Sequence, residues 1–401
     1  MARKMKDSGI EWIGEIPEGW ETQKLKYYAT VTSGEILSRD EYDFSGDIPV
    51  IGSNGKIGTT YKSNNHSEVI TTGRVGTIGT AQIVQDAWIT DNALIIKSHS
   101  INRPFLAYVI PNFDFKFMLS GTAQPLITAT KLKNQYIPVP SSEVQDKLVQ
   151  YLNTQIFNLS HLISQACSSI ELYKKLKQAV ITQAVTKGVR GEREMKDSGV
   201  EWIGKVPSKW NCIKIKYLFE IRKRIAGKEG YTVLSITQTG IKPKNISSNE
   251  GQLADSYSNY QLLHFGEFAM NHMDLLTGWV DISNYNGVTS PDYRVFSLKD
   301  TITNHPRYFL YLMQMCYFNR IFYSMAQGVS NLGRWRLQSD KFLNCIFPVP
   351  SIEEQKEISD YLDTTCSEID KLIAKKEQLV KELESYKKSL IYEVVTGKRK
   401  V

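Results

Sequence analysis

The residues best spaced to do chemistry form one glycine-rich segment, Thr72-Gly73-Arg74-Val75-Gly76-Thr77-Ile78-Gly79. Loops that cradle the phosphates of a dinucleotide use a GxGxxG spacing, whereas these glycines follow GxxGxxG, so a structural turn is favoured. The sequence has no P-loop lysine motif, no GxSxG nucleophile motif and no HExxH metal motif. It also lacks the Asn/Asp-Pro-Pro-aromatic loop of DNA amino-methyltransferases. The sequence therefore predicts no catalytic activity for this chain.

The residue types that are present suit binding to nucleic acid. Residues 211–346 carry fifteen Lys or Arg against ten Asp or Glu, and residues 21–136 carry eleven against ten. Lysine and arginine neutralise phosphates, while Asn, Gln and Arg can form two hydrogen bonds with one base edge. A solvated surface explains any single basic cluster equally well, so the organisation of the whole chain must decide. The clusters interleaved with aromatic or amide residues are Arg222-Lys223-Arg224, Lys242-Pro243-Lys244 and Asn331-Leu332-Gly333-Arg334-Trp335-Arg336.

An internal repeat organises the chain. Residues 5–20 recur at 195–210 with eleven of sixteen positions identical. A second repeat begins with Pro-Val-Pro-Ser at 138–141 and returns at 348–351, each time before a long segment of helical pattern. The first offset is 190 residues and the second is 210, so the segments between them differ in length by 20. The chain is therefore two copies of one plan: a short motif, a variable block and a long helix.

Both long segments are predicted to be helices with a coiled-coil seam, because apolar residues recur in alternating steps of four and three. Pro140 and Pro350 bar helix immediately upstream, and Ser351 with Glu354 forms a predicted capping box. The seam residues are Leu152, Ile156, Leu159, Ile163, Ala166, Ile170, Tyr173, Lys177, Val180 and Ala184, and then Leu362, Cys366, Ile369, Ile373, Lys376, Val380, Leu383, Lys387, Leu390 and Val394.

Two helices of one chain with matching seams are expected to pack against each other, antiparallel, about an internal pseudo-twofold axis. The alternative, in which each helix packs onto its own variable block, fits such a narrow and regular seam less well. The blocks themselves mix strand signals, at 48–51, 93–96 and 231–236, with turn signals at 52–56, 72–76 and 285–287. Segments 104–119 and 306–325 have a helical, aromatic pattern. We therefore predict an α+β fold: two mixed α/β domains separated by two long helices that form an antiparallel coiled coil.

Length and composition are compatible with this plan. A chain of 401 residues predicts two to four domains. A net charge of +7 permits a polyanionic partner without requiring one. The five scattered cysteines, with no CxxC pair, predict reduced thiols. Because no apolar run approaches the ~18 residues of a membrane span and the chain starts with a polar segment, we expect a cytoplasmic protein.

Two similar but unlike modules on a rod of fixed length could act as a ruler on DNA. The grooves of DNA recur every ~34 Å, so two readers related by a twofold axis can address two half-sites. Because the blocks diverged while the frame did not, the half-sites should differ in sequence. The plan predicts an asymmetric, bipartite DNA target.

The order of parts resembles the specificity subunit of type I restriction-modification systems over essentially the whole chain. The resemblance rests on Ser8-Gly9-Ile10-Glu11-Trp12-Ile13-Gly14, the Pro-Val-Pro-Ser helix starts, the two variable blocks and the ending Val394-Val395-Thr396-Gly397-Lys398. It implies that the blocks are target recognition domains and that the helices are spacers that set the half-site separation. It further implies a non-catalytic subunit that binds double-stranded DNA and docks two methyltransferase subunits, through which restriction (translocase) subunits join.

The same resemblance implies that S-adenosylmethionine, ATP and Mg²⁺ belong to the partner subunits, so we expect no cofactor, metal or membrane partner for the chain itself. The predicted parts are an N-terminal motif at 1–20, target recognition domain 1 at 21–137, a central spacer helix at 138–192, the second motif at 193–210, target recognition domain 2 at 211–347 and a C-terminal spacer helix at 348–401.

Residues in predicted loops are the candidates for DNA contact, although loop Asn and Ser serve equally well as turn formers. Trp12, Trp20, Trp202 and Trp210 are expected to anchor the short motifs rather than to stack on bases. The candidates are Ser53, Asn54, Lys56, Thr72, Arg74 and Thr77 in the first block, and Gln238, Lys242, Lys244, Asn271, Asp274, Asn284, Tyr285, Ser290, Asn331, Arg334 and Arg336 in the second.

Two other functions remain open at this point. A coiled-coil adaptor whose mixed domains bind protein or glycan partners would carry its charge incidentally, and its binding would lack the steep salt dependence of phosphate contacts. A self-sufficient DNA-modifying enzyme would bind S-adenosylmethionine by itself. The absence of catalytic motifs argues against this enzyme.

Overall fold

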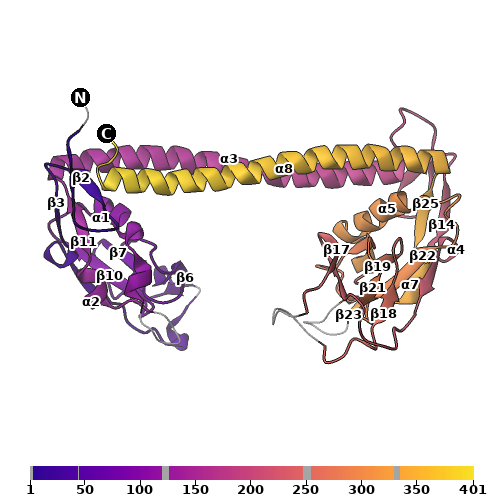
Figure 1. Cartoon of the computed structure of the whole chain (residues 1–401), viewed down its shortest axis with the longest axis horizontal. Coiled ribbons are helices and arrows are strands. Elements are labelled where there is room, and N and C mark those ends of the chain that lie inside the picture. Colours follow the sequence, from indigo (N-terminus) through magenta and orange to yellow (C-terminus); the bar gives the residue numbers. More distant parts are fainter. Residues whose placement is uncertain (1–2, 44, 120–125, 247–253, 329–334) are drawn as a thin grey trace. The chain divides into compact units, whose positions relative to one another are not determined.

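The computed structural model describes residues 3–43, 45–119, 126–246, 254–328 and 335–401. The chain folds into two compact units (Figure 1). Unit 1 comprises residues 1–167 and 377–401, and unit 2 comprises residues 168–376. Each unit is a mixed domain that also holds parts of the two long helices, so the predicted α+β class is confirmed.

The long helices begin and end where the sequence places its breakers. Helix α3 spans Ser142–Lys187 and helix α8 spans Ile352–Val395. Gly188 and Gly397 follow them with φ of +77° and +73°, a left-handed conformation that terminates a helix and that other residues adopt at a cost. Their amides donate to the last turns, to Ala184 O at 3.0 Å and Val394 O at 3.1 Å.

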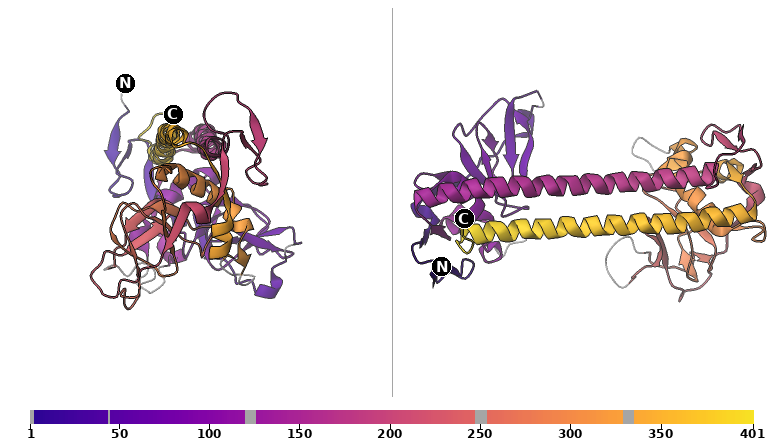
Figure 2. Two further views of the ribbon diagram at one scale, coloured as in Figure 1. Left: turned by 90° about the vertical axis from the view of Figure 1, so that its right-hand side faces the viewer. Right: turned by 90° about the horizontal axis from the view of Figure 1, so that it is seen from above.

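Each unit contains an antiparallel pairing of one half of α3 with the opposite half of α8. In unit 1, Leu152 and Leu159 share a core with Leu390 and Val394. In unit 2, Ala184 shares a core with the α8 residues Ile358, Leu362 and Cys366. All twenty predicted seam residues are buried or half-buried, which confirms the seam. The views of Figures 1 and 2 agree on this side-by-side pairing.

The helix ends also pack onto their own domains, as the alternative interpretation expected. Leu152 lies in one core with Trp20 and Phe105, and Leu362 lies in one core with Trp210 and Phe309. Near the helix ends, seam residues therefore pack against both the other helix and a domain.

Two seam lysines cross from one helix to the other at equivalent positions. Lys177 Nζ lies 2.7 Å from Asp370 Oδ2, and Lys387 Nζ lies 3.0 Å from Ser160 Oγ. Lys387 is the repeat equivalent of Lys177, and Asp370 is that of Ser160, 210 positions on. A polar group at a seam position specifies register at some cost in stability. The lysines thus hold the same antiparallel register in both units.

Unit 1 is built around an antiparallel sheet with the strand order β4-β10-β7-β8. A second sheet, β6-β5-β9, carries the predicted hairpin at 52–56. The strands of unit 1 are β1 (Met5–Asp7), β2 (Glu15–Pro17), β3 (Glu21–Lys24), β4 (Ala29–Ser33), β5 (Ile48–Gly52), β6 (Gly55–Thr60), β7 (Val69–Gly73), β8 (Gln82–Val84), β9 (Trp88–Ile89), β10 (Ala93–Ser98) and β11 (Tyr136–Val139), and its short helices are α1 (Arg103–Val109) and α2 (Ala129–Lys133).

Unit 2 repeats this plan, with the corresponding sheet in the order β15-β22-β19-β20. Aromatic rings fill its core: Phe219 makes edge contacts with Phe268, Phe296 and Phe309 at centroid distances of 5.3 to 5.5 Å. Its strands are β12 (Met195–Asp197), β13 (Lys205–Pro207), β14 (Asn211–Lys214), β15 (Phe219–Arg222), β16 (Leu234–Thr237), β17 (Gly240–Pro243), β18 (Gln261–Leu263), β19 (Phe268–Met270), β20 (Val280–Ile282), β21 (Gly287–Thr289), β22 (Arg294–Leu298), β23 (Gln327–Gly328), β24 (Trp335–Arg336) and β25 (Ile346–Val349), and its shorter helices are α4 (Ile215–Leu218), α5 (Pro306–Phe318), α6 (Ile321–Ser324) and α7 (Ser339–Asn344).

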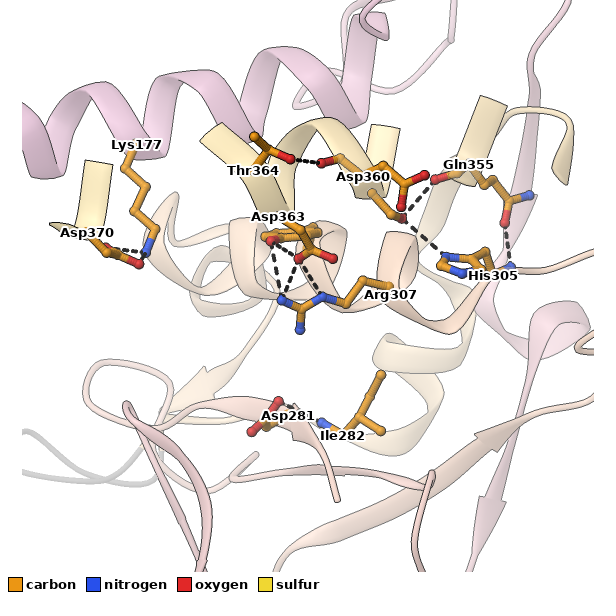
Figure 3. A network of polar contacts seen from close by, with 12 residues as sticks. Lys177, Asp281, Ile282, His305, Arg307, Gln355, Asp360, Asp363, Thr364 and Asp370 are labelled. Atoms are coloured by element: carbon orange, nitrogen blue, oxygen red, sulfur yellow. Dashed lines mark hydrogen bonds and ion pairs between the residues drawn. The ribbon is translucent and has the colours of Figure 1, made fainter. Parts of the chain in front are cut away.

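A repeated glutamine near the start of each long helix ties that helix to its domain. Gln355 accepts from the His305 amide at 2.7 Å, and Gln145 accepts from the Asn102 amide at 2.8 Å. In unit 2, Asp363 of α8 also accepts from Arg307 of α5, at 2.6 and 2.8 Å (Figure 3). These bonds attach each mixed domain rigidly to a helix end.

The repeated motifs form the hairpins β1-β2 and β12-β13, whose tryptophans are structural anchors as predicted. Trp20 and Trp210 are buried. Trp12 contacts Phe113 and Trp202 contacts Phe347, with edge-on rings. The four tryptophans therefore pack the hairpins into the cores of their units.

The predicted capping box at the start of α8 forms only in part. Ser351 Oγ accepts from the Glu354 amide at 3.4 Å, but the Glu354 carboxylate bonds elsewhere. It accepts from Arg193 Nη1 at 2.5 Å and from Trp210 Nε1 at 3.0 Å. Arg193 and Trp210 of the second motif thus bind the carboxylate that would otherwise complete the capping box.

Replacing Glu354 with alanine should therefore destabilise unit 2 by about 2 kcal/mol, because Arg193 and the Trp210 indole lose a shared, buried acceptor. Urea unfolding of the full chain measures this change. The exposed neighbour Glu353 is the control, and its replacement should cost less than about 1 kcal/mol. Equal effects of the two substitutions would contradict this role of Glu354.

The remaining general predictions concern cysteines and membranes. All five cysteines are free thiols, and burial raises the pKa of the Cys345 thiol to about 12. Within the described ranges, no helix is both long and apolar enough to cross a bilayer.

Candidate nucleic-acid interface

In unit 1 the structure brings two predicted loops into direct contact. The β5-β6 hairpin presents Ser53 and Asn54 at its tip, and the glycine-rich loop follows β7. Thr80 Oγ1 donates to Ser53 O at 3.3 Å. A methyl group on Gly73 would lie 1.8 Å from Thr77 O and 2.8 Å from Ser53 O, so only glycine allows this approach. The glycine-rich segment is thus a packed turn, as its spacing predicted.

In unit 2 the corresponding loops also meet. Gln238, at the tip of the β16-β17 hairpin, donates to Thr277 O at 3.3 Å. Thr277 belongs to the loop between β19 and β20, which is organised by its own side chains. Asn271 Oδ1 accepts from the amides of Met273 and Asp274, and Asp274 Oδ1 accepts from the amide of Thr277.

The backbone conformation shows that the tips of the β5-β6 and β16-β17 hairpins occupy equivalent positions in the two units. Gly55 and Gly240 each follow a hairpin tip with φ of +104°. They face Gln82 of β8 and Asp281 of β20, respectively. Asp281 also accepts from its neighbour, the Ile282 amide, at 2.8 Å (Figure 3). The two hairpin tips are therefore equivalent. They hold candidates that were predicted separately in the two blocks: Ser53 and Asn54 in unit 1, and Gln238 in unit 2.

A third segment completes each group of loops. The Ile127 amide donates to Arg74 O at 3.0 Å, and the Leu337 amide donates to His272 O at 2.9 Å. Arg336 precedes Leu337 and is exposed. Each unit thus has a surface made of a hairpin tip, the loop after the third strand of the sheet and the strand segment before α2 or α7. We call these surfaces tip surface 1 and tip surface 2.

The predicted candidates differ in their access to solvent. Asn54, Lys56, Thr77, Gln238, Lys242, Asn284, Tyr285 and Arg336 are exposed, and Ser53, Arg74, Lys244, Asn271, Asp274 and Ser290 are half-buried.

One predicted position is wrong, and four other candidates lie outside tip surface 2 or outside the described residues. Thr72 was expected in a loop, but it lies in β7, is 2% exposed, and so cannot reach a ligand at the surface. Its β-branched side chain suits the sheet interior better than a turn. Asn284 and Tyr285 follow β20, at the end opposite to the loop that holds Asn271 and Asp274, so they are not part of tip surface 2. Asn331 and Arg334 lie outside the described residues.

Residues that the loop criterion missed also lie at these surfaces. Gln82 and Asp281 are on strands, directly beside the hairpin tips. Arg294, the first residue of β22, and His272 are buried in unit 2. Burial, reinforced by the positive charges of Arg294 and Arg336, lowers the pKa of His272 to about 3. A charged residue at the edge of an apolar strand is the one sequence signal that could have identified Arg294.

The arrangement fits binding better than catalysis. In the described part of the chain, no three His, Cys, Asp or Glu side chains are grouped to hold a metal. The candidates supply amide, hydroxyl and cationic groups on two rigid hairpin and loop supports. Such groups can contact phosphates and base edges.

Known proteins resemble the chain over both units. A family model for the type I restriction modification DNA specificity domain matches residues 17–171 and again 207–382, more than half of the chain. The type I restriction enzyme MjaVIII specificity subunit of Methanocaldococcus jannaschii is 23% identical over 327 residues, which cover 78% of this chain and 71% of that protein.

One solved structure shares the fold at low sequence identity. A chain from a structure on the assembly and conformational transition of the type I R-M system has a TM-score of 0.67 and 13% identity, over 95% of this chain and 98% of that one. The HsdS subunit from Thermoanaerobacter tengcongensis has a TM-score of 0.49 and 14% identity, over 96% of this chain and 98% of that one.

Proposed function

The chain belongs to the type I restriction-modification DNA specificity family, and we propose that it reads a bipartite, asymmetric DNA target with one half-site for each tip surface. Members of this family are specificity subunits and not catalytic ones, so the chain is not an enzyme by itself. Methyl transfer, and any cleavage, would be performed by partner subunits that hold S-adenosylmethionine, ATP and Mg²⁺. With DNA as its substrate, the protein would act in the cytoplasm.

The observation that carries this proposal is that the two units repeat one architecture but place different side chains at the positions expected to contact DNA bases. The two tip surfaces use equivalent backbone positions, but Ser53 and Asn54 in one correspond to Gln238 and Thr239 in the other. Different side chains on the same support would select different bases. The register held by Lys177 and Lys387 would keep the half-site separation constant.

The target itself tests the proposal. A library of randomised duplexes is incubated with the complex of this chain and its methyltransferase subunits, and the methylated duplexes are sequenced. We expect one target with two unlike specified parts and an unspecified gap of constant length. Selection of a contiguous palindrome, or of no sequence at all, would exclude the ruler.

Apolar residues on the long helices support the docking of two methyltransferase subunits. Seven exposed apolar or aromatic residues directly precede a seam residue, a position that lies on the same flank of both helices in an antiparallel pair. Leu372 is the repeat equivalent of Leu162, and Tyr386 is that of Leu176, so each unit carries one copy of the pattern. Such patches mark protein contacts. The seven residues are Leu162, Leu379 and Tyr386 in unit 1 and Leu172, Leu176, Tyr361 and Leu372 in unit 2, each 40 to 65% exposed.

Replacing Leu162 or Leu372 with aspartate should then weaken the docking of one methyltransferase subunit at least about tenfold, and the double variant should lose both. Native mass spectrometry of the assembled complex measures the stoichiometry. Phe157→Asp is the matched control, since Phe157 is 73% exposed on α3 but follows a seam residue and does not precede one. A double variant with unchanged stoichiometry would rule out this docking surface.

A further inference from the structure

Unit 2 contains a buried arginine without an acidic partner. Arg294 is 4% exposed. Its Nη2 donates to Leu337 O at 2.9 Å and to Ser339 Oγ at 3.2 Å, and its guanidinium carbon lies 4.7 Å from the centre of the Phe342 ring. These acceptors are neutral, and no carboxylate in the described part of the chain forms an ion pair with it. Buried arginines are rare unless they are paired, because losing hydration is costly.

A second arginine close to Arg294 adds to this positive potential. Arg336 is exposed and close enough to lower the pKa of Arg294, which burial already lowers to about 10. Arg294 nevertheless remains charged at neutral pH, whereas His272 is neutral there. His272 Nδ1 is buried and has no hydrogen-bond partner among the described residues. Neither guanidinium therefore forms an ion pair with a residue that the structure describes.

Among the described residues of tip surface 1, no pair of arginines occupies the equivalent positions. Leu94 faces Thr72 across the sheet of unit 1 just as Arg294 faces Met270 in unit 2. Arg74 and His272 are equivalent, because each carbonyl accepts from the segment before α2 or α7. Arg74 lies two residues after Thr72, and His272 lies two residues after Met270. Leu94, the strand partner of Thr72, is therefore the equivalent of Arg294, the strand partner of Met270. Leu126 likewise precedes Ile127 as Arg336 precedes Leu337. The uncompensated charge is thus a property of unit 2 and not of the common fold.

We propose that Arg336, supported by Arg294, binds a DNA phosphate at tip surface 2, so that the second domain holds the DNA backbone more strongly than the first. The proposal rests on the proposed function, since a phosphodiester supplies the missing negative charge. Arg336 contacts the phosphate. Arg294 is a positioning residue: it holds the segment that carries Arg336 through the carbonyl of Leu337. Phosphate contacts orient a protein on the duplex without reading its sequence.

The test measures DNA binding by the complex of the full chain with its methyltransferase subunits, as fluorescence anisotropy of a labelled duplex over a series of salt concentrations. Two duplexes are used, one with the target found by the library selection and one of random sequence. Arg336→Gln should weaken binding to both about tenfold at 0.1 M salt and reduce the slope of log Kd against log salt by about one. Lys371→Gln removes an equal charge from an exposed position on α8 and should change neither quantity.

Arg294→Leu introduces the residue of unit 1 and should reproduce the reduced slope, while Arg294→Lys should restore part of it. If Arg294→Leu fails to fold, as judged by thermal unfolding, Arg336→Gln alone decides. An unchanged slope for Arg336→Gln, or weaker binding to the target duplex only, would overturn the phosphate site. Failure of the unmodified complex to bind either duplex would instead overturn the proposed function.

Discussion

Adding one heptad to each long helix should lengthen the gap of the DNA target by about three base pairs. Seven residues extend a helix by ~10.5 Å, and a base pair rises ~3.4 Å. The insertions are placed after Ile170 in α3 and after Lys376 in α8. The contacts of Lys177 with Asp370 and of Ser160 with Lys387 define the register of the two helices. In that register the two insertion points lie opposite each other. At that level the seam continues without a shift.

The enlarged protein should methylate its original target at least about a thousandfold less efficiently, because one half-site is then misplaced and each mismatched base pair costs ~1 to 3 kcal/mol. Repeating the library selection measures the new gap. Replacing the exposed residues Glu171, Lys174 and Lys175 with other helix-forming residues, which keeps the seam and the helix length, is the control and should leave the gap unchanged. An unaltered gap after insertion would mean that the helices do not set the spacing.

A fragment ending at Arg193 should self-associate through its exposed seam, and should do so more tightly when Val144 and Lys147 are both replaced with glutamate. In the full chain, Arg190 bonds to Glu357 at 2.7 and 2.8 Å, and Arg193 bonds to Glu354. The repeat equivalents of these glutamates in α3 are Lys147 and Val144.

Two copies of α3 would therefore bring Arg190 against Lys147 at both ends of the pair. Reversing the charge at two exposed contacts, at ~0.2 to 1 kcal/mol each, predicts a gain on the order of tenfold or more in dimer affinity. Sedimentation equilibrium measures it, and the dimer should select an inverted repeat of the first half-site. Glu143→Gln is a control on the same helix turn. Fragments that remain monomeric with and without the substitutions would contradict the pseudo-twofold arrangement.

The frame of this protein was predictable because its signals are periodic. Each long helix carries a seam of ten positions, and the first is bounded by Pro140 and Gly188. The same pattern returns 210 residues later. The simplest fold that buries both seams is an antiparallel pair of helices. The partners of the Glu354 carboxylate were not predictable, because Arg193 and Trp210 lie 161 and 144 positions away in the sequence. A capping box read from adjacent residues cannot include such distant groups.

The reading surfaces were predictable only in part. Turn chemistry correctly identified the hairpin tip at Ser53 and Asn54, since conformational preferences act locally. The same criterion misassigned Thr72, because its place inside the sheet depends on pairing with Leu94 across 22 positions. It also selected both Asn271 and Tyr285, which the structure places in turns before and after β20.

Sequence alone determined the duplication, the helical seams, the family resemblance and the lack of catalytic motifs, because each depends on residue order along one segment. Folding determined which loops of the two blocks are equivalent, which candidates reach solvent, and that Arg294 is buried without an acidic partner among the described residues. These properties depend on strand register and on burial, which join residues that are distant in the chain. For that reason a basic residue inside a strand, rather than a basic cluster in a loop, distinguishes the second unit from the first.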